Sequence, residues 1–221
     1  FQIGVIFMKY SKLVENAKKP NGFWGKMMIK AMNKGHSSLT SWGLEHMNIE
    51  RTATVLDIGC GGGKTVDRLC SIVANGKVYG IDYSELSVKS SEKLNSKNIL
   101  CNKAKILQAS VSDMPFDDNT FDNITAVETY YFWPDKENDV KEVFRVLKHG
   151  GTVMLLFEML RTDDDPFKWE KVENMLNIKS VTPQEIRAVL ESAGFENINT
   201  YTKEGTTWLC ATAQKPKDDE N

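Results

Sequence analysis

The clearest candidate for chemistry in this sequence is a glycine-rich segment near residue 57. Residues 57–63 read Asp-Ile-Gly-Cys-Gly-Gly-Gly and directly follow the apolar run Thr54-Val55-Leu56. The glycines at positions 59, 61 and 63 carry no side chain, so the backbone of such a turn can approach a ligand closely. This pattern, a strand followed by a glycine-rich turn, suits several cofactors that contain a nucleotide.

Two common glycine-rich motifs do not fit the spacing. The dinucleotide pattern G-x-G-x-x-G, counted from Gly59, requires a third glycine where the chain has Lys64. The phosphate-binding pattern G-x-x-x-x-G-K-[ST] matches Gly63-Lys64-Thr65 at its end but requires glycine at position 58, which is Ile58. An NAD-dependent oxidoreductase therefore remains only an alternative.

Alternating strand-like and helix-like segments surround this loop. Helices are predicted directly after the loop, at residues 84–95 and 136–147, and from Thr182, with Pro183 at N1 and Glu185 at N3, to Ala193. Strands are predicted at residues 54–58, 77–82, 104–109, 123–127, 152–157, 197–202 and 207–214. The short turn at 203–205 predicts a closing hairpin.

These elements predict an α/β fold: a doubly wound, mostly parallel seven-stranded sheet with an antiparallel C-terminal strand and an N-terminal helical cap. We expect the cap at residues 1–50, the core at 51–214 and a polar tail at 215–221. In such sheets a ligand lies outside the carboxyl ends of the strands, which is where the glycine loop belongs.

The composition of the chain limits its partners. With 221 residues, 41% hydrophobic and 26% charged, the chain is typical of one soluble domain. A net charge of -2 gives no general attraction to nucleic acid. The four cysteines form no CxxC pair, which favours free thiols in the cytoplasm over a zinc site or disulfides. The apolar stretch 1–8 is too short to span a membrane and lacks the features of a signal peptide.

Four segments carry a family resemblance. They read Val-Leu-Asp-Ile-Gly-Cys-Gly at 55–61, Val-Tyr-Gly-Ile-Asp-Tyr-Ser at 78–84, Met-Pro-Phe-Asp-Asp-Asn-Thr-Phe-Asp at 114–122 and Val-Phe-Arg-Val-Leu-Lys-His-Gly-Gly at 143–151. In this order they resemble the class I S-adenosylmethionine-dependent methyltransferases over nearly the full chain, most closely the quinone and sterol branch. The resemblance implies S-adenosylmethionine as cofactor, S-adenosylhomocysteine as product and a small-molecule acceptor.

The resemblance assigns roles along the cofactor. Asp82, at the end of a strand, is expected to accept hydrogen bonds from the ribose hydroxyls; alternatively it caps the helix that follows. Tyr83 either packs on the adenine or fills ordinary space. Asp57 is expected under the methionine portion, or it satisfies loop amides. Ser110 and Val111 stand where the family often has Asp-Ala at the adenine, and a serine hydroxyl can still accept that hydrogen bond.

The expected cofactor-binding set comprises the loop, the strand ends and the adenine-side residues: Asp57, Gly59, Cys60, Gly61, Gly63, Asp82, Tyr83, Ser110, Val111 and Glu128.

The acceptor side is expected after the fourth strand, where residues 128–134 read Glu-Thr-Tyr-Tyr-Phe-Trp-Pro. Glu128 could balance the charge of the cofactor, serve as a base or lie solvated in a loop. Glu128, Tyr131 and His36 are the catalytic candidates, although His36 could also be a packing or capping residue. No metal is expected, and a homodimer remains open. A stripe of Met and aromatic residues is either a lid or core packing: Phe23, Trp24, Met27, Met28 and Met32.

Overall fold

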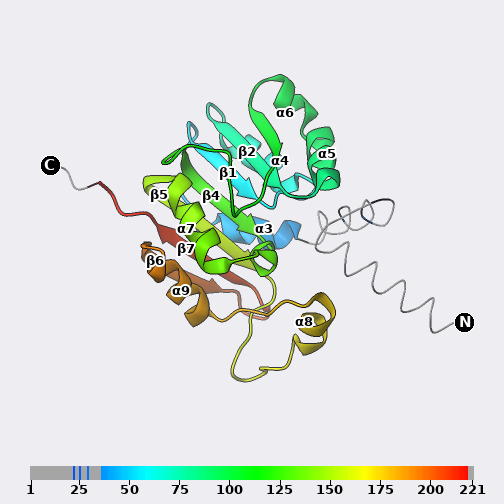
Figure 1. Cartoon of the computed structure of the whole chain (residues 1–221), viewed down its shortest axis with the longest axis vertical. Coiled ribbons are helices and arrows are strands. Elements are labelled where there is room, and N and C mark those ends of the chain that lie inside the picture. Colours follow the sequence, from blue (N-terminus) through cyan, green and yellow to red (C-terminus); the bar gives the residue numbers. More distant parts are fainter. Residues whose placement is uncertain (1–21, 23–24, 26–28, 30–35, 219–221) are drawn as a thin grey trace, which may run out of the picture.

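The computed structural model describes residues 36–218 together with Gly22, Gly25 and Ile29 (Figure 1). The predicted lid residues Phe23, Trp24, Met27, Met28 and Met32 lie outside the described residues. The assignment of residues 1–50 as a cap therefore stays a prediction. No helix in the described part of the chain has the length and apolar character needed to cross a membrane.

The described residues form one seven-stranded sheet with the order β3-β2-β1-β4-β5-β7-β6. β7 is antiparallel to both of its neighbours, β5 and β6, while the other pairs are parallel. This confirms the predicted fold class. The strands are β1 Thr54–Ile58, β2 Lys77–Asp82, β3 Ala104–Gln108, β4 Phe121–Val127, β5 Leu147–Phe157, β6 Glu196–Thr202 and β7 Leu209–Gln214.

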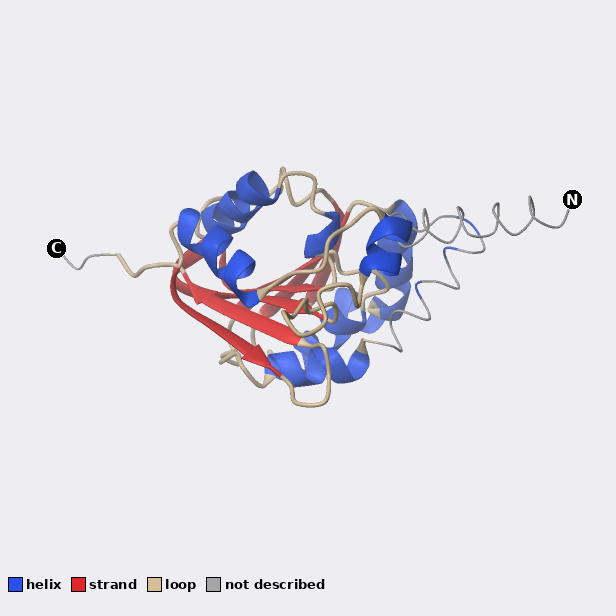
Figure 2. Ribbon diagram, turned by 90° about the horizontal axis from the view of Figure 1, so that it is seen from below, coloured by secondary structure: helices blue, strands red, loops and turns tan. Residues whose placement is uncertain are grey.

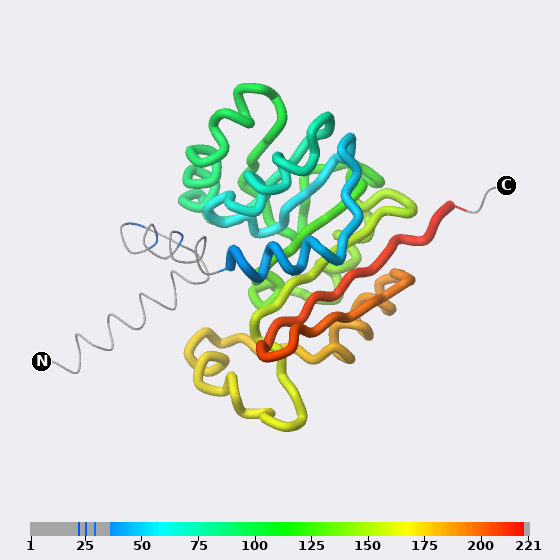
Figure 3. Tube along the Cα trace, turned by 180° about the vertical axis from the view of Figure 1, so that it is seen from behind, coloured from blue at the N-terminus to red at the C-terminus, as the bar shows by residue number. Residues whose placement is uncertain are grey.

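Helices cover both faces of the sheet, as Figure 2 shows from below. On one face, α3 packs against β5, α4 against β1 and β2, and α5 against β2 and β3. Figure 3 shows α3 running across the sheet. On the other face α7 contacts β5 and α9 contacts β6 and β7. The helices are α3 Ser37–Leu44, α4 Lys64–Ile72, α5 Glu85–Leu94, α6 Ser96–Leu100, a 3-10 turn η1 Tyr130–Phe132, α7 Lys136–Val146, α8 Glu170–Leu176 and α9 Pro183–Ser192.

The two faces follow from the alternation of side chains along each strand. In β1, Leu56 packs into the cluster beneath α7 and α9, whereas its neighbour Val55 packs beneath α4 and α5. In β5, Leu155 joins the first cluster and Leu156 packs against α3. Both faces of the central strands are therefore apolar, as a parallel sheet covered on both sides requires.

Several local predictions are confirmed and a few differ. Thr182 and Glu185 form the predicted capping box at the start of α9. α3 begins at Ser37, and no helix with these bounds was placed there from the sequence. β5 starts at Leu147, before the predicted residue 152, because Leu147 already pairs with Phe121 ahead of an irregularity in the register. The short helices α6 and α8 were not predicted.

Candidate functional site

A cleft opens at the carboxyl ends of β1, β2 and β4, the edge of the sheet where the sequence placed the ligand. Its empty volume is about 910 Å³, part of it open to solvent. Eight of the predicted site residues line it: His36, Asp57, Gly59, Cys60, Gly61, Asp82, Tyr83 and Glu128. Residues that lie in four different segments of the chain thus meet at one place.

Two glycines of the loop have no room for a side chain, each because of a different neighbour. Gly59 has φ +67°, and a Cβ there would lie 2.2 Å from Oγ1 of Thr129. Gly63, at φ +80°, caps α4 against α5, where a Cβ would lie 2.3 Å from Oγ of Ser91. Gly63 is not among the described residues that line the cleft, so its observed role is to let the loop pack on α5.

Asp82 ties the second strand to this loop. One carboxylate oxygen accepts the amide of Gly61 at 2.9 Å, and the other accepts the amide of Ser84 at 2.8 Å. Burial raises the pKa of Asp82, and these hydrogen bonds oppose the rise. The side chain of Ser84 is the N-cap of α5. Asp82 therefore ties the glycine loop to the start of α5, whereas the N-cap itself is Ser84.

Asp57 lies at the base of the cleft and is held from β4. The hydroxyl of Thr125 donates to its Oδ1 at 2.7 Å. Burial raises the pKa of Asp57 to about 7, and the Thr125 hydrogen bond opposes the rise. Near neutral pH this carboxyl is consequently divided between its protonated and its ionised form, and a cation bound in the cleft would favour the ionised form.

Glu128 occupies the end of the cleft beyond β4, in a left-handed backbone conformation with φ +58°. Its Oε1 accepts the backbone amide of Glu158 and lies 3.5 Å from the hydroxyl of Tyr131. That hydroxyl in turn accepts the amide of Met159 at 3.0 Å. Burial is the main reason that the pKa of Glu128 rises to about 8. The contacts join the ends of β4 and β5.

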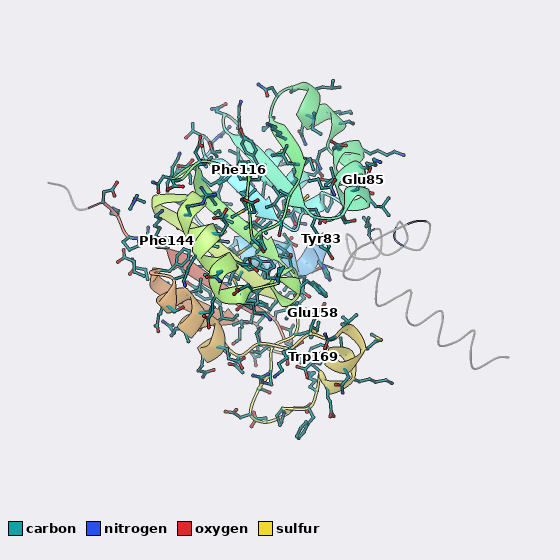
Figure 4. The ribbon with its side chains drawn as sticks, viewed as in Figure 1. Tyr83, Glu85, Phe116, Phe144, Glu158 and Trp169 are labelled. Atoms are coloured by element: carbon teal, nitrogen blue, oxygen red, sulfur yellow. The ribbon has the colours of Figure 1, made fainter. Side chains whose placement is uncertain are left out.

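His36 and Glu158 complete this group. Nε2 of His36 lies 3.9 Å from Oε2 of Glu158, and burial lowers the pKa of His36, which favours the neutral imidazole. His36, Glu128 and Glu158 each offer a ligand atom within 4.8 Å of the others, an arrangement that could hold a metal ion. The expectation that the site works without a metal therefore stays a prediction. Tyr83 and Glu158, labelled in Figure 4, follow β2 and β5.

The raised pKa of Glu128 predicts a pH-dependent stability. Because the folded state binds the proton more tightly than the unfolded chain, this contribution is complete below about pH 4.5 and is lost as the pH rises through about 8. In wild type the free energy of unfolding should fall between pH 6 and 9 as Glu128 loses its proton. In Glu128→Gln this fall should be smaller by about 2 kcal/mol. This is less than the full shift implies, since solvent reaches part of Glu128.

Urea unfolding at both pH values measures this difference. The exposed Glu170→Gln on α8 is the matched control and should leave the pH dependence unchanged. An equal pH dependence in Glu128→Gln and wild type would contradict the assignment. Asp57 makes the same contribution to the pH dependence of unfolding in wild type and in both variants, so it cancels from the comparison.

Besides Gly63, three predicted site residues do not line the cleft. Val111 is buried in the core beneath α7, and Oγ of Ser110 accepts the amide of Ser112. Neither is among the described residues that line the cleft, so their adenine contacts stay predictions. Tyr131 lines a second cavity, next to the first. Of the other histidines, His46 stacks on Tyr201 and His149 is exposed.

Sequence reasoning missed the contribution of α3 and α4 to the cleft. Ser37 and Thr40 line it from α3, and Arg68 of α4 donates to both the carbonyl and the hydroxyl of Ser37. Glu158 was also missed. No periodicity or motif marks these polar residues, because only the packing of α3 across the end of the sheet brings them to the site.

Comparison with known proteins agrees with this geometry. A family model described as a methyltransferase domain matches residues 56–155. The uncharacterized methyltransferase YdaC of Bacillus subtilis is 27% identical over 183 residues, covering 82% of this chain and 93% of that protein. The ubiquinone/menaquinone biosynthesis C-methyltransferase UbiE of Cronobacter sakazakii is 31% identical over 181 residues, covering 71% of this chain and 72% of that protein.

The comparison with solved structures finds the same fold. A SAM-dependent methyltransferase from Aquifex aeolicus superposes with a TM-score of 0.66 at 21% identity, covering 85% of this chain and 96% of that one. The chain spans less than half the length of the sterol 24-C-methyltransferases that it matches. The oxidoreductase alternative finds no support among these relatives. With its glycine loop, its strand order and these relatives, the chain belongs to the class I S-adenosylmethionine-dependent methyltransferases.

Proposed function

We propose that the protein transfers a methyl group from S-adenosylmethionine to a small-molecule acceptor by direct in-line displacement. The observation that carries the proposal is the carboxylate of Asp82, fixed by the amides of Gly61 and Ser84 where β2 ends in the cleft. Beside its hydrogen bonds with Gly61, Ser84 and Ser87, the carboxylate keeps a lone pair that can accept a ribose hydroxyl. The donor set of the cleft thus fits the proposed cofactor.

The remaining residues divide along the length of the cleft. Tyr83, Ser110 and Val111 would hold the adenosine end. Asp57 and the backbone of Gly59 to Gly61 would hold the methionine end, where the Asp57 carboxylate favours a positively charged ammonium. Glu128 lies farther along, beside the aromatic residues of η1.

The bound cofactor supplies a methyl carbon on a positively charged sulfonium, which leaves as a neutral thioether. An electron pair of the acceptor would form the new bond to this carbon, and the carbon–sulfur pair would stay with sulfur. The protein's part is to hold the acceptor in line and exclude water. When ionised, Glu128 offsets positive charge at this end of the cleft. The neutral imidazole of His36 can accept the acceptor's proton, and Tyr131 positions Glu128.

Calorimetric titration tests the cofactor assignment. We expect S-adenosylmethionine and S-adenosylhomocysteine both to bind, and the affinity for S-adenosylmethionine to rise more between pH 6 and 8.5, because Asp57 and Glu128 lose protons over that range. An absence of binding heat from correctly folded protein would reject the proposal. Cofactor binding without release of S-adenosylhomocysteine for any acceptor would instead favour a non-catalytic binding module.

We also propose a cytoplasmic location, which is supported by the four free cysteines, of which Cys60, Cys70 and Cys210 are buried. A homodimer is also proposed, and sedimentation of the purified chain would decide it.

A further inference from the structure

A second cavity, with an empty volume of about 1130 Å³ that is partly open to solvent, lies beside the cofactor cleft. It lies between η1 with the start of α7 on one side and α8 with the following loop on the other. Tyr83 and Phe132 line both the cavity and the cleft. The cavity and the cleft are therefore neighbours that share these two side chains as a boundary.

The inner wall of this cavity is aromatic. Tyr131, Phe132 and Trp133 line it from η1 and the residue that follows, and Tyr83 lines it from the end of β2. Tyr131 is 4% exposed and Trp133 is 6% exposed, so their rings are firmly packed. The indole Nε1 of Trp133 is buried without a hydrogen-bond partner among the described residues. Aromatic faces of this kind suit a flat ring.

The cavity also carries a positive charge on each of its two sides. Lys136, from the start of α7, and Lys179, from the loop after α8, both line it. Neither forms an ion pair with a described residue. Glu173 also lines the cavity, but its Oε1 accepts the amide and hydroxyl of Ser180 at 2.7 and 2.5 Å. Two lysines and one glutamate leave a net positive charge facing the cavity.

We propose that this cavity receives the methyl acceptor and that the acceptor is a planar aromatic molecule carrying an anionic group, an aromatic acid. The inference rests on the proposed function. The ring packs against Trp133 and Phe132 with its methyl-accepting atom toward the cofactor cleft. The anionic group lies between Lys136 and Lys179, because the lining of the cavity holds two lysines against a single carboxylate.

The charge requirement is tested with two probes of the same shape. 2-Naphthoate is ionised at neutral pH, whereas 2-naphthamide is neutral. Calorimetry in the presence and in the absence of S-adenosylhomocysteine measures the affinity of each. We expect wild type to bind the acid about tenfold more tightly than the amide, and Lys136→Gln/Lys179→Gln to lose this preference. Lys171→Gln, an exposed residue of α8 that does not line the cavity, should retain it.

Equal affinity for the two probes in wild type overturns the inference, as does a preference that survives in the double variant. So does a lack of 2-naphthoate binding up to about 1 mM. If S-adenosylhomocysteine binds but any of these three contrary outcomes is observed, the inference fails and the proposed function stands. If S-adenosylhomocysteine does not bind, the proposed function fails, and the assignment of the cavity as an acceptor site fails with it.

Discussion

Asp82→Asn is expected to weaken the binding of S-adenosylhomocysteine by about 100-fold, or about 2.7 kcal/mol. The variant removes the charge that the ribose hydroxyls would meet. It also turns an amide donor toward Gly61 N or Ser84 N, both of which are donors themselves. Calorimetric titration of the variant and wild type measures the loss.

Two comparisons separate a ribose contact from a general change in the loop. The exposed Asp117→Asn is the matched control and should bind as wild type does. 5′-Methylthioadenosine keeps the ribose but lacks the amino acid portion. If Asp82 contacts the ribose, the variant loses affinity for this probe and for S-adenosylhomocysteine by a similar factor. Unchanged affinity for both compounds would contradict the assignment.

Gly59→Ala should destabilise the fold by about 3 kcal/mol and weaken cofactor binding as well. About 1 to 2 kcal/mol arises because an alanine at φ +67° is strained. The rest arises because its Cβ would lie 2.2 Å from Oγ1 and 2.7 Å from Cβ of Thr129, and this contact forces the loop to shift. Urea unfolding measures the change in the free energy of unfolding.

Gly205→Ala is the control that measures only the cost of placing an alanine at a positive φ. Gly205 has φ +72° in the hairpin between β6 and β7, and a Cβ there would meet nothing within 4 Å. We expect a cost of about 1 kcal/mol for this variant. Adding Thr129→Gly to Gly59→Ala should recover part of the remaining difference. If Gly59→Ala costs no more than Gly205→Ala, close packing on Thr129 does not constrain the loop.

Local sequence determined most of the elements. The strands β1 and β2 begin and end at the predicted residues, because apolar runs bounded by glycine or a capping serine have few alternatives. The capping box at Thr182 and Glu185 needs only residues three positions apart, so its pattern is visible in the sequence. The short helices α6 and α8 lack a strong apolar period, and no local signal marked them.

Much of the proposed cofactor side was also accessible from the sequence. Asp57, Gly59 and Asp82 lie within or directly after strands that are neighbours in the sheet, so predicting the strands also predicts that these residues meet. Register counting at Ile58 and Lys64 then separated this loop from two other cofactor loops.

The sequence singled out His36, Glu128 and Tyr131 for the proposed acceptor side, but only the tertiary structure decided how this side is assembled. His36, Glu128 and Glu158 converge although they come from three distant segments, and the raised pKa of Glu128 depends on burial that no local pattern reveals. Lys136 and Lys179 share a cavity only because α8 returns to face η1. The glycine loop follows from short-range backbone sterics, which the sequence contains directly. Burial and the pairing of distant charges depend instead on how the helices pack over the sheet.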